Sequence, residues 1–202
     1  MPHDHKHKFD PANFARLEDP RRLEFFPQTP LAAALALKPG DRVIDIGCGV
    51  GYWLLALLDA APEGVLFTGV DIERAMLERL EQKLKEHPRR GQVTLLTSTE
   101  HELPVADASQ DVAILGLVYH ELADRKGFLK EIKRTLTPGG RLAIIDWDVL
   151  PPGVERTMGP PMEERAPFAT ASVEVPAAGF ENLRRVDGYR ETYALIATKP
   201  RT

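Results

Sequence analysis

A chain of 202 residues with 43% apolar and 28% charged residues is predicted to form one domain with a substantial core. Its formal net charge of −4 does not mark a nucleic-acid-binding protein, and the single cysteine, Cys48, excludes a disulfide framework and a multi-cysteine metal site. No apolar run is long enough to span a membrane and the N-terminus is polar, so we expect a cytoplasmic protein.

Residues 1–40 are a polar lead-in that prolines cut into short pieces, with one short helix expected over residues 30–37. The alternating histidines near the N-terminus are predicted to lie in a disordered tail, so no metal site is expected there. These histidines are His3, His5 and His7. The main domain follows the lead-in and is expected to span residues 41–202.

From residue 41 onward, short apolar runs alternate with amphipathic segments. Strands are predicted over residues 42–46, 65–71, 93–98, 111–118 and 141–147. Helices are predicted over residues 52–61, 73–87 and 125–136, the last stopped by "TPGG", and around residues 170–178. This alternation predicts a doubly wound α/β fold with parallel strands and helices on both faces. The segment "ENLRRVDGYRETYALIATKP" predicts an antiparallel hairpin that closes the sheet.

The stretch "VIDIGCGVGYW" ends a strand with an acid, Asp45, and continues with Gly47, Gly49 and Gly51. Such a turn lets the backbone approach a nucleotide at the carboxyl end of a strand. The dinucleotide fingerprint requires its third glycine at the position of Tyr52, and an acid beside the turn would repel a pyrophosphate. The spacing therefore argues against NAD.

A second acid, Asp71, ends the second strand 20 residues after Gly51, where a carboxylate can bind both hydroxyls of a ribose. Ile72 follows it and offers an apolar surface for a flat base. The alternative role of Asp71 is that of a helix N-cap. Together the acids and glycines favour a nucleoside with a cationic or amino-bearing tail, a description that S-adenosylmethionine matches.

The chain resembles the class I S-adenosylmethionine-dependent methyltransferases, in the small bacterial type-11 branch related to the ubiquinone and menaquinone methyltransferases. The resemblance covers residues 41–150 and lies in five motifs that follow one another at the family's spacing. They are "VIDIGCGVG", "TGVDIERAMLERL", "LPVADASQDVAIL", "VYHEL" and "FLKEIKRTLTPGGRLAIIDW". It implies a Rossmann-like sheet of seven strands, mostly parallel, whose last strand is antiparallel.

For the cofactor, the resemblance implies that Asp45, Gly47 and Gly49 hold the methionine end of S-adenosylmethionine. Asp71 would bind the ribose hydroxyls, with Ile72 against the adenine. Gly51 completes the glycine turn.

The family often places an acid after the third strand to receive the adenine amino group, but here that position is Thr99. We therefore assign this contact jointly to Ser98, Thr99 and Glu100. After the fourth strand, Gly116 and Leu117 would border the methionine moiety.

Two polar residues at the carboxyl edge are candidates for catalysis. His120, in "VYHEL", could act as a general base, or it could be a structural residue that caps this edge. Asp146 ends the fifth strand and could orient an acceptor or anchor a loop. The proline-rich segment 150–165 follows it and is predicted to form part of the acceptor pocket, the alternative being a linker.

The acceptor is predicted to be a small molecule. Signatures of the nucleic-acid methylases are absent, and one cysteine is too few for a metalloid methyltransferase. No nucleic-acid or membrane partner is expected, and the chain is expected to be a monomer or a homodimer. Two alternatives stay open: a non-catalytic protein that senses S-adenosylmethionine, and a less favoured NAD(P)-dependent oxidoreductase.

Methyl transfer also requires a site shielded from water. Only the lead-in, over residues 9–28, and the segment 150–165 are long enough and suitably placed to cover the carboxyl edge. We predict that both form a lid. The alternative is that the aromatic residues of the lead-in pack it onto a remote helix face.

Overall fold

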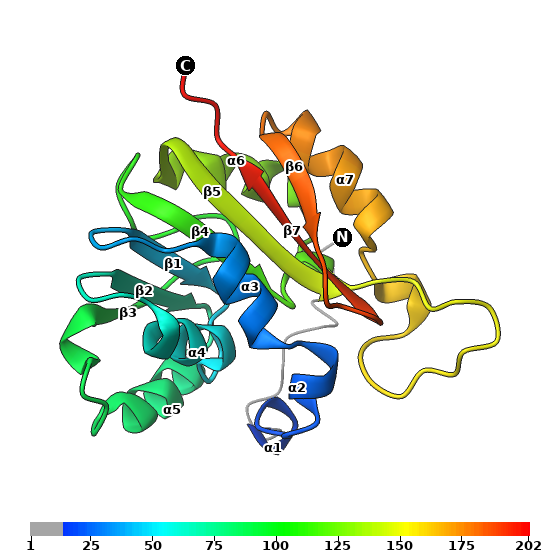
Figure 1. Ribbon diagram of the computed structural model, residues 1–202, viewed down its shortest axis with the longest axis horizontal. Helices are drawn as coiled ribbons and strands as arrows, with labels where there is room; N and C mark the ends of the chain where they lie inside the picture. The colour runs from blue at the N-terminus through cyan, green and yellow to red at the C-terminus, as the bar shows by residue number, and fades with distance from the viewer. Residues whose placement is uncertain (1–13) are drawn as a thin grey trace, which may run out of the picture.

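A computed structural model describes residues 14–202, so His3, His5, His7 and Phe9 lie outside the described residues. Its core is one seven-stranded sheet in the order β3-β2-β1-β4-β5-β7-β6 (Figure 1). The strands are β1 (Arg42–Ile46), β2 (Leu66–Asp71), β3 (Val93–Thr97), β4 (Gln110–Gly116), β5 (Leu136–Trp147), β6 (Glu181–Val186) and β7 (Thr192–Thr198). Strands β1 to β5 are parallel, and β7 is antiparallel to both β5 and β6, as predicted.

Helices cover both faces of this sheet (Figure 1). The longer helices are α3 (Gln28–Leu35), α4 (Tyr52–Ala60), α5 (Arg74–Leu84), α6 (Arg125–Thr135) and α7 (Phe168–Ala177). One apolar cluster joins α3, α4 and α5 to the first face, and a second joins α6 and α7 to the other. The predicted three-layer arrangement of helices around a sheet is confirmed.

The residue pattern explains this layering. Along β4, Val112 and Ile114 belong to the first cluster, while Ala113 and Leu115 belong to the second. Because successive strand side chains point to opposite faces, a strand covered on both sides must be apolar throughout. Helix α5 needs only one apolar stripe, and its predicted stripe is buried: Met76, Leu77, Leu80 and Leu84.

Most element boundaries differ from the sequence-based expectation by a few residues, and the largest difference lies at the start of β5. Helix α6 ends at Thr135, and β5 already begins at Leu136 rather than after "TPGG". Leu136 pairs with Gln110, and the next paired residue of β5 is Arg141, so the residues between them form an irregularity inside the strand. The two glycines of "TPGG" therefore interrupt the pairing of a strand and do not separate a helix from it.

The lead-in forms two further short helices before α3, namely α1 (Phe14–Leu17) and α2 (Arg22–Phe25). Phe26 follows α2 and is fully buried, in edge-on contact with the Trp147 ring at a centroid distance of 4.8 Å. The hydroxyl of Tyr52 donates to the Phe26 carbonyl at 2.7 Å. The lead-in is thus packed against α4 and the end of β5.

The carboxyl ends of the parallel strands meet at one edge of the sheet, where ligands bind in open α/β folds. The strand order reverses between β1 and β4, which is the topological switch point of this sheet. Three further short helices are 3-10 turns: η2 (Arg90–Gln92), η3 (Tyr119–Glu121) and η4 (Met162–Glu164). Within residues 14–202, no helix has the length and apolar character needed to cross a membrane.

Candidate active site

The glycine turn leaves β1 at the switch point and enters α4. The backbone N–H groups of Gly47 and Cys48 both donate to the Val70 carbonyl, at 2.8 and 3.0 Å, which ties the turn to β2. Gly47, Gly49 and Gly51 all have positive φ, of 68°, 51° and 88°. These left-handed conformations explain the preference for glycine at all three positions.

The surroundings of the three glycines distinguish their roles. A Cβ atom on Gly47 would lie 2.4 Å from Val118, and one on Gly51 would lie 2.4 Å from Leu80. These two glycines therefore allow close packing. A Cβ atom on Gly49 would meet no atom within 4 Å, so Gly49 alone faces open space, where a ligand can approach the backbone.

Asp71 fixes the conformation of this turn. One of its carboxylate oxygens accepts the N–H of Gly49 at 2.8 Å, and the other accepts the N–H of Glu73 at 2.9 Å. Burial raises the pKa of Asp71, although these backbone hydrogen bonds act in the opposite direction. The N-cap of α5 is Glu73, so the N-cap alternative for Asp71 is wrong. Ile72 beside it keeps 37% of its surface exposed.

Five buried side-chain polar atoms have no hydrogen-bond partner in the described part of the chain, and two of them belong to residues that flank the glycine turn, Oδ2 of Asp45 and Nε1 of Trp53; the others are on Arg22, Gln110 and Glu191. Asp45 is only 2% exposed, and burial raises its pKa to about 7, against a hydrogen bond from the backbone N–H of Leu54. The Trp53 indole lies against Gly116, where a Cβ atom would come within 2.2 Å of Nε1. Buried polar groups are almost always paired, so these two atoms indicate a ligand.

The donor set fits S-adenosylmethionine. Its methionine end carries an ammonium group, which needs an acceptor such as Oδ2 of Asp45, and a carboxylate, which needs a donor such as Nε1 of Trp53. Open space for the ligand lies at Gly49, in the turn that joins β1 to α4. Trp53 carries no signal of this role in the sequence, where it is one more apolar residue of a predicted helix.

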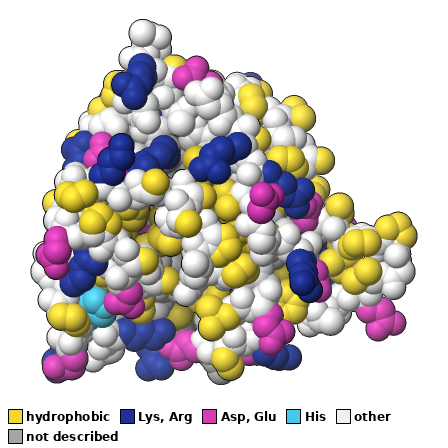
Figure 2. All heavy atoms as spheres, viewed as in Figure 1, with side chains coloured by type: hydrophobic (Ala, Val, Ile, Leu, Met, Phe, Trp, Pro, Cys, Tyr) yellow, Lys and Arg dark blue, Asp and Glu magenta, His cyan; other side chains and the backbone are white. Residues whose placement is uncertain are grey.

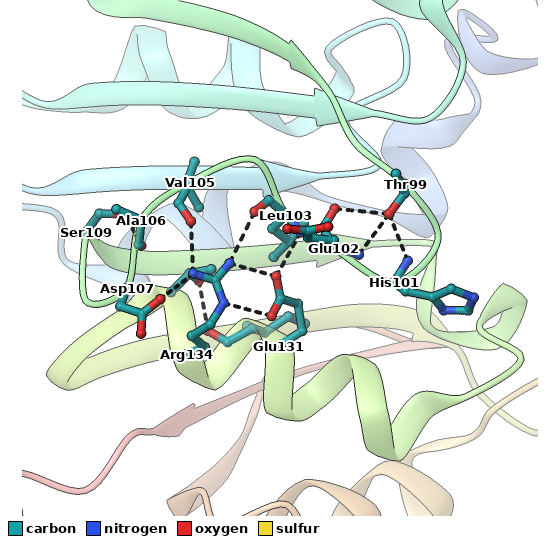
Figure 3. A network of polar contacts seen from close by, with 12 residues as sticks. Thr99, His101, Glu102, Leu103, Val105, Ala106, Asp107, Ser109, Glu131 and Arg134 are labelled. Carbon is teal, nitrogen blue, oxygen red and sulfur yellow. Dashed lines mark hydrogen bonds and ion pairs between the residues drawn. The ribbon is translucent and has the colours of Figure 1, made fainter.

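The segment after β3 was assigned jointly to the adenine contact. The N–H of Ser98 donates to the Asp71 carbonyl at 3.0 Å, so this segment starts beside the proposed ribose site. The Thr99 hydroxyl accepts the N–H groups of His101 and Glu102, at 3.3 and 3.0 Å (Figure 3). Thr99 therefore closes its own turn, which occupies its hydroxyl. Glu100 lies inside that turn and is half-buried.

Arg134 of α6 holds the rest of this segment in place (Figure 3). Its guanidinium donates to the carbonyls of Leu103 and Val105, at 3.1 and 3.0 Å, and pairs with Glu131 and Asp107. Glu131 in turn accepts the N–H of Leu103 at 2.8 Å. A charged network of this kind fixes the path of a long loop and so sets where Ser98 and its neighbours lie.

After β4, the chain turns sharply at the switch point. Leu117 has a positive φ of 65°, which is rare for a residue with a branched side chain, and its N–H donates to the Ile145 carbonyl at 2.8 Å. Gly116 before it leaves room for the Trp53 indole. Of the two residues predicted to border the methionine moiety, Gly116 thus lies next to one of the unpaired polar atoms.

His120 and Asp146, predicted separately, form a direct pair. Oδ1 of Asp146 lies 2.8 Å from Nδ1 of His120, and Oδ2 accepts the backbone N–H of His120 at 3.0 Å. Asp146 is fully buried, and its Oδ1 also accepts the N–H of Trp147 at 2.7 Å. When His120 is neutral, its Nδ1–H donates a hydrogen bond to the Asp146 carboxylate, which leaves Nε2 as the basic nitrogen.

The charge around His120 favours its protonated form. Burial alone would lower the pKa of His120, but the hydrogen bond to Asp146 and the negative charges of Asp146, Glu121 and Glu164 outweigh it, so the pKa is raised. Oε1 of Glu121 lies 3.8 Å from Nε2 of His120. The raised pKa makes the neutral imidazole a stronger base, and its neutral form is the one that could act as a general base.

Cys48 lies between the first two glycines of the turn. Cys48 is 5% exposed, and burial raises the pKa of its thiol, so it acts as a small packing residue. Within residues 14–202, no three His, Cys, Asp or Glu side chains are grouped in a way that could hold a metal ion.

Comparisons with known proteins agree with this geometry. Residues 44–144, half of the chain, match the family described as a methyltransferase domain. The crystal structure of a SAM-dependent methyltransferase from Aquifex aeolicus is 31% identical in sequence and superposes with a TM-score of 0.84. The match covers 95% of this chain and 99% of that chain.

Curated relatives have narrower names. The 27-O-demethylrifamycin SV methyltransferase of Amycolatopsis mediterranei is 35% identical over 121 residues, which are 60% of this chain and 44% of that protein. The demethylmenaquinone methyltransferase of Lysinibacillus sphaericus is 31% identical over 112 residues, 55% of this chain and 47% of that protein. The chain thus spans less than half the length of these two relatives.

Proposed function

Because this chain belongs to the family of class I methyltransferase domains that use S-adenosylmethionine, we propose that it transfers a methyl group from this cofactor to a small-molecule acceptor. One observation carries the proposal. Two unpaired buried polar atoms that fit the cofactor and a histidine–carboxylate pair that fits an acceptor lie at the same edge of the sheet.

Each residue of the cofactor site has a separate task. Asp45 and Trp53 would bind the methionine end, and Asp71 would accept both ribose hydroxyls on the lone pairs that its backbone donors leave free. Ile72 would lie against the adenine, because it is exposed directly beside Asp71. When bound, S-adenosylmethionine supplies a methyl group on a positively charged sulfur, which is already activated.

The acceptor site needs a base only when the acceptor must lose a proton. Nε2 of His120 would take that proton, and Asp146 would stabilise the resulting imidazolium. Glu121, which is exposed and 3.8 Å from Nε2, would pass the proton to solvent. The structural alternative is that the pair only anchors η3 to the end of β5.

The names of the curated relatives indicate which acceptors to test first. One relative is named for demethylmenaquinone and another for 27-O-demethylrifamycin SV. Quinol precursors and phenols therefore lead the panel, followed by amines and thiols. Purified protein is incubated with S-adenosylmethionine and each acceptor, and S-adenosylhomocysteine is quantified. We expect at least one acceptor to give product above the acceptor-free rate.

Variants then test the histidine. With a hydroxyl acceptor, His120→Gln should lower kcat at neutral pH by about 100-fold or more and leave S-adenosylhomocysteine affinity unchanged. The control is His87→Gln, because His87 forms a similar pair with Asp59, at 3.0 Å, elsewhere in the protein. An unchanged kcat in His120→Gln would favour the structural alternative.

A non-catalytic role is the second candidate function. It would be supported if the protein bound S-adenosylhomocysteine tightly and no acceptor on the panel gave product. The observation in its favour is that the cofactor contacts derived above describe binding alone, whereas turnover depends on the histidine pair.

We also propose that the lead-in covers the cofactor site. Glu18, just after α1, pairs with Lys83 and Arg79 of α5, at 2.8 and 3.1 Å. Lys83 also donates to the Val50 carbonyl in the glycine turn at 3.1 Å. Through Lys83, the lead-in is therefore linked to the glycine turn. A ligand held in the glycine turn would lie beneath the lead-in.

A further inference from the structure

The segment after β5 is a long loop with two differently packed parts. Its tip, residues 151–157, is exposed and projects from the body of the protein (Figure 1). Apolar side chains gather on the resulting lobe (Figure 2), and Val149 and Val154 are 57% and 46% exposed. In the returning part, Met158 packs against the first apolar cluster and Arg165 is buried, whereas Met162 and Glu163 between them are exposed. The difference between the exposed tip and the returning part requires contacts that hold the returning part in place.

Trp147 is the surface that receives the returning part. A Cβ atom on Gly159 would lie 2.6 Å from the Trp147 ring, so the backbone of Gly159 touches the indole. Gly159 has a positive φ of 84°, which suits this close approach. The same indole contacts Phe26 of the lead-in. Trp147 directly follows Asp146, the carboxylate that holds His120.

Arg165 fastens the loop at this point. Its guanidinium donates to three backbone carbonyls: Asp148 at 2.7 Å, where the loop leaves β5, and Pro160 and Met158, both at 3.2 Å, where it returns. The guanidinium also lies over the Trp147 ring, 5.1 Å from its centroid. Arg165 is only 7% exposed. One buried cation thus ties both ends of a long loop to each other.

The loop fastened in this way leads into the catalytic pair. Arg165 directly follows η4, which comprises Met162–Glu164. The ring that Arg165 covers belongs to Trp147, whose backbone N–H donates at 2.7 Å to the Asp146 carboxylate that holds His120. The clamp therefore lies one residue from the His120–Asp146 pair, and the negative charge of Glu164 in η4 also acts on His120.

We propose that Arg165 is a positioning residue for the acceptor side of the site: it clamps the loop after β5 so that η4 forms the wall beside His120. This inference rests on the proposed methyl transfer, because only that reaction makes the wall part of an acceptor site. The clamp itself is a property of the free protein. It needs neither cofactor nor acceptor to be measured.

The test uses the full chain with Arg165→Met, which keeps an unbranched apolar stem and removes every donor. Hydrogen exchange across residues 158–165 should become at least about tenfold faster, because three charged hydrogen bonds are lost. The pKa of His120, followed by NMR of its ring protons, should fall as Glu164 moves away. Glu164→Gln calibrates that fall. Arg165→Lys should restore part of both effects, because a lysine ammonium retains a charged donor.

A second variant reaches the same clamp from the other side. Gly159→Ala places a methyl group against the Trp147 ring without touching Arg165, and it should reproduce both changes. Glu155→Ala, in the exposed tip, is the matched control and should change neither. An unchanged exchange rate or an unchanged His120 pKa in Arg165→Met would overturn the proposal.

Cofactor binding separates this proposal from the proposed function. Arg165→Met should bind S-adenosylhomocysteine within about twofold of the parent protein, because the clamp acts on the acceptor side. A large loss of affinity would show that Arg165 supports the cofactor site or the fold and would overturn the positioning role. If the parent protein itself failed to bind S-adenosylhomocysteine, the proposed function would fail, while the exchange and NMR results would still decide the clamp.

Discussion

Replacing Asp71 tests the cofactor site at the residue with the most defined geometry. Its carboxylate is 8% exposed, and each oxygen already accepts one backbone N–H, from Gly49 or from Glu73. Each oxygen has a second lone pair for one ribose hydroxyl. Asp71→Ala would therefore remove two contacts to the ligand and two contacts that shape the glycine turn.

The size of the effect follows from these contacts. A hydrogen bond to a charged group contributes about 1.5–3 kcal/mol, and water that fills the vacated space recovers part of it. We expect Asp71→Ala to lose about 2–4 kcal/mol of binding free energy, or about 30- to 900-fold in Kd. Asp71→Asn retains one acceptor oxygen, so its loss should be about half as large.

Titration calorimetry with S-adenosylhomocysteine measures this loss, and thermal unfolding shows whether each variant is folded. Asp59→Ala is the matched control, because Asp59 is a largely exposed carboxylate paired with His87 at the end of α4 that is remote from the turn. It should bind as the parent does. If Asp71→Ala is folded and binds within about threefold of the parent, the ribose assignment is wrong.

Three further predictions concern the same edge of the sheet. Burial raises the pKa of Asp45 to about 7, and the ammonium group of the ligand needs the ionised carboxylate. The affinity for S-adenosylhomocysteine should therefore rise about tenfold per pH unit up to pH 7 and then level off. Equal affinity at pH 6 and 8 would contradict this, and Asp45→Asn should remove the dependence. Gly49→Val should weaken binding at least about tenfold by filling the open space, whereas Gly153→Val, at a glycine with the same open surroundings and positive φ, should not. Saturation with S-adenosylhomocysteine should slow hydrogen exchange across residues 14–28, and unchanged protection there would argue against the lid.

Much of the fold could be predicted because its signals are local. The alternation of buried strands and amphipathic helices follows from the spacing of apolar residues within each segment, such as the apolar stripe of α5. The positive φ angles of the turn are indicated by the glycines themselves. The terminal hairpin was predicted because "DGYRE" leaves no room for a helix. The start of β5 was placed too late because the two glycines of "TPGG" are typical of a turn, whereas in the structure they lie inside the strand, where its pairing with β4 is irregular.

The candidate site was predicted only in part, because its remaining features depend on residues far apart in the sequence. His120 and Asp146 were identified singly, and their direct pairing appears only when β4 and β5 lie side by side. Trp53 carries an unpaired donor that no periodicity reveals. Arg165 resembles any charged residue of a proline-rich loop until its three carbonyl partners are known.

Calorimetric titration of the parent protein with S-adenosylhomocysteine and, separately, with NAD tests the central claim most directly. The glycine spacing, the two acids and the unpaired atoms of Asp45 and Trp53 predict saturable binding of S-adenosylhomocysteine at micromolar concentrations and little binding of NAD. Saturable NAD binding with no heat from S-adenosylhomocysteine would contradict the account.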